Sequence, residues 1–88
     1  MHTQEETENI QLELNDELQK LFKNKSFKRL IVDGYLDTGS IKLTNALSKV
    51  KPEQKEFIVE EMMARSLFRN FLNNIEEDAR SILEARSM

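Results

Sequence analysis

The sequence contains neither glycine nor proline between Glu53 and Arg86, and this uninterrupted stretch constrains the fold most strongly. Pro52 suits the first turn of a helix, where its missing N–H has no partner to lose, and Glu53 follows it near the positive end of the helix dipole. We therefore expect a helix of about 35 residues, on the order of 50 Å long. A chain of 88 residues is too short to cover such a helix alone. Either it breaks near Asn73 and Asn74, or its end projects and pairs with another chain.

Apolar side chains recur along this stretch at the spacing of one helical face. Because the stripe is longer than the remaining chain can cover, it predicts self-association. Arg65 and Arg69 lie four residues apart beside it, and arginine, methionine and aromatic residues are enriched at protein interfaces. Alternatively, the arginine stems cover a core within the chain. The predicted interface residues are Ile58, Met62, Arg65, Phe68, Arg69, Leu72, Ile75, Ala79 and Ile82.

Shorter helices are expected before Pro52. The first has Thr7 as its N-cap and extends to about Lys23, with isoleucine and leucine at helical spacing. Residues 1–6 are polar and lack an apolar anchor, so they are predicted to form a disordered tail. Residues 7–88 are then a single helical domain.

The only two glycines, Gly34 and Gly39, mark the expected boundary between a second and a third helix. The second helix is predicted from Phe27 to Asp33 behind a Ser26 cap, and Gly34 suits the left-handed conformation that closes a helix. A tight turn follows, and the third helix is predicted from Asp37 or Thr38 to Ser48, with Gly39 inside it at a cost of about 1 kcal/mol. Residues 40–44 also alternate like a strand, but one strand has nothing to pair with, so a helix is the better prediction.

Charge is divided unevenly: residues 1–20 are acidic, residues 21–51 basic and residues 52–88 acidic, for a net charge of −3. Such stretches attract one another within a chain, in a second copy or in a partner. Bases beside aromatic residues are typical of nucleic-acid contacts. A helix-turn-helix protein, however, needs a recognition helix with several Arg, Lys, Asn or Gln side chains on its exposed face. The third helix has only Lys42 and Asn45 there, so nucleic-acid binding ranks second to protein–protein interaction. The residues predicted for it are Lys23, Lys25, Lys28 and Arg29.

Catalytic and metal chemistry is not expected. The chain has no cysteine and one histidine, His2, which lies in the expected tail. Adjacent acids such as Glu60 and Glu61 point in different directions on a helix and do not form a facing pair. We predict no catalytic residue, metal ligand or cofactor. No apolar stretch approaches the length of a membrane span, and the acidic start does not look like a secretory signal, so a cytoplasmic protein without a membrane partner is expected.

One segment resembles a known group of proteins. Residues Phe27–Leu36, followed by a polar turn, an apolar helix and a late Phe71-Leu72-x-x-Ile75, are similar to small helical proteins of tailed bacteriophages. The resemblance covers about residues 18–76. It implies a viral accessory or assembly protein, located in the host cytoplasm or the virion, and no catalytic residue.

These observations predict an all-α fold, in which three short helices pack on a long C-terminal helix in a helical-bundle homo-oligomer. The predicted function is non-enzymatic protein–protein interaction, with a second copy or with an unidentified protein. Under the phage resemblance it acts in virion assembly or inhibits a host factor.

Overall fold

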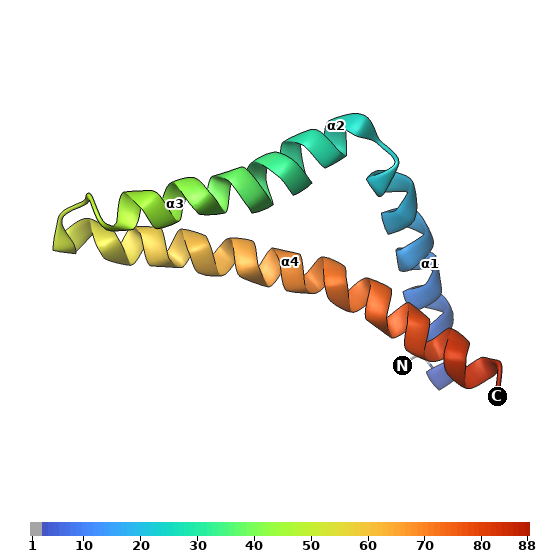
Figure 1. Cartoon of the computed structure of the whole chain (residues 1–88). Coiled ribbons are helices and arrows are strands. Elements are labelled where there is room, and N and C mark those ends of the chain that lie inside the picture. The colour runs from blue at the N-terminus through green and yellow to red at the C-terminus, as the bar shows by residue number, and fades with distance from the viewer. Residues whose placement is uncertain (1–2) are drawn as a thin grey trace.

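The computed structural model describes residues 3–88, which are almost entirely helical and contain no strand, so the predicted all-α class is confirmed. Segments α2, η1 and α3 form one continuous rod, α4 returns beside it, and α1 crosses to the C-terminal half of α4 (Figure 1). The start of α1 and the end of α4 therefore lie at the same end of a molecule measuring 53 × 30 × 23 Å. The elements are α1 (Gln4–Phe22), α2 (Lys25–Phe27), η1 (Lys28–Thr38), α3 (Gly39–Leu47) and α4 (Pro52–Arg86).

Helix α1 begins at Gln4, three residues before its predicted start. The cap is Thr3 and not Thr7: the Thr3 hydroxyl accepts a hydrogen bond from the Glu6 N–H at 3.2 Å. Two acids in the first turn also favour this start through the helix dipole. Residues 4–6 of the predicted disordered tail therefore belong to the helix, while residues 1 and 2, including His2, lie outside the described part of the chain.

The predicted tight turn between the second and third helices is wrong, because helix continues from Lys25 to Leu47. Gly39 lies inside helix, as predicted. No residue in the described range 3–88 has a positive φ, and Gly39 is helical at φ −60° and ψ −41°. The predicted Ser26 cap is also replaced: the Asn24 side chain accepts from the Phe27 N–H at 2.9 Å. The second and third predicted helices are thus one rod.

The middle of this rod, η1, is a π-helix, in which each N–H bonds to the carbonyl five residues earlier. Its last such bond runs from the Gly39 N–H to the Gly34 carbonyl. Ordinary α-helix resumes in α3, where the Thr44 hydroxyl donates to the Ser40 carbonyl at 3.0 Å. The wider winding of η1 carries the chain through both glycines without a turn.

Helix α4 runs without a break through Asn73 and Asn74 for 35 residues, with Pro52 in its first turn as predicted. The core is small and draws one leucine from each of α1, η1 and α4: Leu18, Leu36 and Leu72. Ala79 of α4 is also buried, at 1% exposure. Partly buried side chains surround the three leucines, namely Phe22, Tyr35, Phe68 and Ile75.

Candidate interaction surfaces

The predicted interface residues lie on the side of α4 that faces the rod and α1. Leu72 and Ala79 are buried, and Arg69 is exposed. This placement differs from the free stripe expected from the sequence, because the continuous rod and α1 together cover most of it. The half-buried members of the set are Ile58, Met62, Arg65, Phe68, Ile75 and Ile82.

Arg65 joins α4 to the rod, and its side chain is only 16% exposed. Its Nε donates to the Tyr35 carbonyl at 3.0 Å, and its guanidinium lies 4.3 Å from the centre of the Tyr35 ring. A second guanidinium nitrogen pairs with Glu61 at 2.7 Å. Arg65 therefore contributes a hydrogen bond, a cation–π contact and an ion pair within one chain.

The change from π-helix to α-helix explains the Arg65 hydrogen bond. Where the bonding changes from five-residue to four-residue spacing, one backbone carbonyl is left without an N–H donor. The Tyr35 carbonyl, one residue after Gly34, lies at this change and accepts from Arg65 instead. A Cβ at Gly39 would stand 3.2 Å from the Arg65 Nε, so glycine gives the guanidinium room to reach the helix backbone.

Two further arginines hold α4 against the rest of the chain. Arg69 pairs with Asp37 of η1 at 2.8 Å, and Arg86 donates to the Asn9 side chain of α1 at 3.0 Å. Each arginine on this face that was expected at an interface thus has a partner within its own chain.

A second apolar stripe lies on the opposite, outer side of α4. Val59, Met63, Leu67 and Phe71 follow one another every four residues and are 44%, 59%, 65% and 56% exposed. We call these four residues the outer stripe. Apolar side chains of α3 and α1 extend it at its two ends. A groove lined by Leu47, Val59, Met62, Met63, Ser66 and Leu67 borders its start, and a groove lined by Gln11, Leu14, Phe71, Asn74, Ile75 and Asp78 borders its end.

The sequence reasoning missed the outer stripe, although a signal for it was present. Apolar residues in α4 occur in adjacent pairs, and one member of each pair faces inward while the other faces outward. The pairs are Ile58 and Val59, Met62 and Met63, Leu67 and Phe68, and Phe71 and Leu72. Adjacent residues stand about 100° apart on a helix, so pairs repeated along α4 indicate apolar surface that extends well beyond one narrow face.

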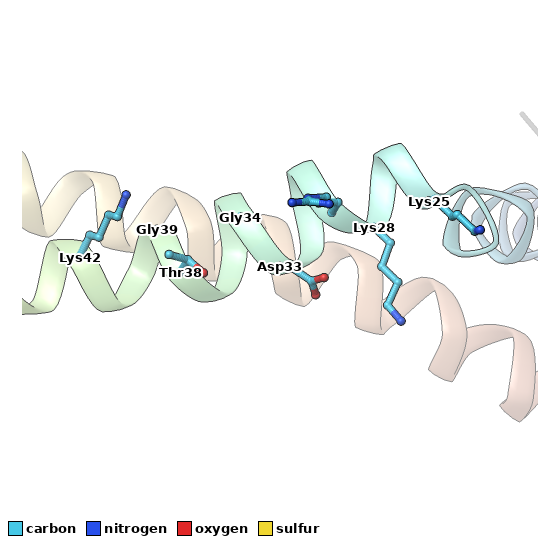
Figure 2. Close-up of a pocket in the computed structure, with 8 residues that line it drawn as sticks. Lys25, Lys28, Asp33, Gly34, Thr38, Gly39 and Lys42 are labelled. Atoms are coloured by element: carbon cyan, nitrogen blue, oxygen red, sulfur yellow. The ribbon is translucent and has the colours of Figure 1, made fainter.

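Basic side chains gather on the rod. A shallow depression there is lined by Lys25, Lys28, Arg29, Asp33, Gly34, Thr38, Gly39 and Lys42 (Figure 2). We call its four bases, Lys25, Lys28, Arg29 and Lys42, the basic strip. Three of them were predicted from the sequence as a cluster. The fourth predicted base, Lys23, lies outside the strip, at the C-terminal cap of α1. Lys42 of α3 belongs to the strip because α2, η1 and α3 form one continuous rod.

Two further features, a metal-ion cluster and a membrane-spanning helix, are absent from residues 3–88. No group of three histidine, cysteine, aspartate or glutamate side chains in residues 3–88 is arranged to hold a metal ion. Within the same range, no helix combines the length and apolar character that crossing a membrane requires.

Comparison with known proteins adds no family to this description. No protein-family model matches the chain, and neither a curated protein nor a solved structure shows significant similarity to it.

Proposed function

We propose that the chain is a non-enzymatic, helical protein–protein interaction module that self-associates through the outer stripe of α4. The observation that carries this proposal is the stripe itself, four large apolar side chains on one line with about half of each exposed. Contiguous apolar surface of this kind is uncommon on monomers and marks interaction sites.

A second copy is the partner that the thin core favours. Among the described residues only Leu18, Leu36, Leu72 and Ala79 are buried apolar side chains. Small chains bury a small fraction of their surface and are marginally stable alone, so a partner that covers more of the apolar surface stabilises the fold.

The expected affinity is modest. Complete burial of one large apolar side chain contributes about 1.5–3 kcal/mol, so completing the burial of two half-exposed stripes contributes roughly 6–12 kcal/mol. Association itself costs about 4–15 kcal/mol. A micromolar dimer needs a surplus of about 8 kcal/mol, which only the favourable ends of these two ranges leave, so we place the dimer in the micromolar to high micromolar range.

The spacing of the outer stripe also suits packing against a copy of itself. Side chains four residues apart form the ridge that interdigitates when two helices cross at about −50°, the commonest helix packing. A two-fold axis at the crossing pairs each ridge with the same ridge of the other copy. Acids lie at both ends of the stripe, where crossed helices diverge: Glu56 and Glu60 at one end, Glu77 and Asp78 at the other. Salt screens their repulsion, so association should strengthen as ionic strength rises.

Assembly is the role that such a module supports. Under the resemblance to small helical phage proteins, the same surface serves virion assembly or the inhibition of a host factor. The arginines of the inner face have partners within the chain and are left out of this proposal.

Sedimentation velocity over a range of concentrations tests the proposal. The wild-type chain should shift from monomer to dimer mass, and Leu67→Asp should remain monomeric because a carboxylate in the contact cannot be desolvated without a partner. Leu30→Asp is the matched control, since Leu30 is 70% exposed but lies on the rod, and it should dimerise like the wild type. A wild-type protein of monomer mass at high micromolar concentration contradicts the proposal, as does dimerisation of the Leu67→Asp variant.

A further inference from the structure

The basic strip has uncompensated charge. None of its four cations pairs with a carboxylate in the described residues. Lys23, Lys49, Lys51, Lys55 and Arg80 are unpaired as well, and the strip differs from them in gathering four such cations along one depression. Only one acid, Asp33, lines the same depression. The strip therefore projects a positive potential from a chain whose net charge is −3.

The arrangement of these cations suits an extended polyanion. Lys25 and Lys42 stand toward opposite ends of the depression, with Gly34 and Gly39 between them (Figure 2). They are seventeen positions apart along the rod, which is roughly 20–25 Å, because the α-helix rises about 1.5 Å per residue and the wider π-helix of η1 rises less.

A DNA duplex has the charge density for such a surface. It carries one negative charge per about 1.7 Å of axis, so phosphates are available along the whole length of the strip whatever the base sequence. The strip offers three lysines and one arginine, which contact phosphates readily but read few bases.

We propose that the basic strip binds the phosphate backbone of a DNA duplex without reading its sequence. With four phosphate contacts, the logarithm of the binding constant should fall with the logarithm of salt concentration with a slope of about −3.6. Binding is then clear at low salt and weak at physiological salt, where the acidic remainder of the chain opposes it. This surface is separate from the outer stripe, so either proposal can fail without the other.

Fluorescence anisotropy of a labelled duplex of mixed sequence, titrated with the full chain at several salt concentrations, tests the proposal. The variant Lys25→Gln/Arg29→Gln/Lys42→Gln should reduce the salt slope by about three and weaken low-salt binding at least about tenfold. The matched control, Lys49→Gln/Lys51→Gln/Lys55→Gln, removes the same charge from exposed positions outside the strip and should keep most of the affinity and the slope. Circular dichroism of both variants confirms that they remain helical.

Four results would overturn the proposal. One is the absence of duplex binding by the wild-type chain at about 50 mM salt, a concentration at which phosphate contacts are strong. A second is equal loss in the two triple variants, which indicates attraction to net charge alone. A third is competition by polyglutamate as effective as competition by duplex at equal charge, which indicates an acidic protein partner. The fourth is tighter binding to a single strand than to the duplex.

Discussion

The inner and outer faces of α4 contain similar apolar residues but are covered to very different extents. Leu72 on the inner face is 8% exposed, whereas Leu67, five residues earlier on the outer face, is 65% exposed. The difference arises from the other helices, because the rod and α1 cover one side of α4 and leave the other open (Figure 1). Hydrophobicity along a helix shows how much of its surface is apolar, and the packing of the rest of the chain decides which part of that surface is covered and which is left exposed.

Polar anchors also distinguish the two faces. On the inner face, Arg65 and Arg69 fix α4 to the rod through the Tyr35 carbonyl and Asp37. On the outer face, the exposed polar neighbours Ser66 and Asn70 make no side-chain bond to another helix in the described residues. A surface without fixed polar partners is easier to bury, since few hydrogen bonds must be replaced.

The largest expected effect contrasts the two leucines. Leu72→Ala should lower the free energy of unfolding by about 2–5 kcal/mol, because it removes buried side-chain volume from a small core. Leu67→Ala should change it by less than about 0.5 kcal/mol when measured well below the dimerisation concentration. Urea unfolding followed by circular dichroism measures both, and equal losses for the two variants would show that the faces are not different.

Arg65→Ala should have the next largest effect, a loss of about 1–3 kcal/mol in the free energy of unfolding. The variant leaves the part-buried Tyr35 carbonyl without its donor and removes the guanidinium from the Tyr35 ring. Arg65→Lys should recover little of this loss, because a lysine ammonium cannot reproduce the planar contact with both the carbonyl and the ring. Full recovery by lysine would mean that charge alone holds α4 to the rod.

Arg69→Ala should have the smallest effect, about 0–1 kcal/mol in the free energy of unfolding. Its ion pair with Asp37 is short, at 2.8 Å, but both side chains are about half exposed, and water and salt weaken such pairs. The comparison with Arg65 is made by chemical denaturation at low and high salt. A loss for Arg69→Ala as large as that for Arg65→Ala would contradict the different roles assigned to the two arginines.

The parts of the fold that follow from local periodicity were predictable from the sequence. The all-α class and the helix beginning at Pro52 rest on helical spacing and on a run without glycine or proline. The continuity of the rod was not predictable, because Gly34 and Gly39 are typical of a turn. Their role depends instead on π-helical winding and on the approach of Arg65, a residue distant in sequence.

The candidate surfaces were predictable only in part. Lys25, Lys28 and Arg29 are close in sequence and were expected to act together, but Lys42 joins them only once the rod is known to be continuous. The apolar character of α4 was also clear. Which of its residues face outward depends on where the rod and α1 pack, and that is a property of the whole chain.

Disulfide cross-linking tests most directly the central claim that the outer face of α4 meets a second copy. The chain has no cysteine, so a single introduced thiol reports on one position. Met63→Cys, in the outer stripe, should form linked dimers rapidly under mild oxidation, whereas Ser26→Cys, exposed on α2, should link slowly and only by chance collision. Equal linking rates for the two variants would contradict the account.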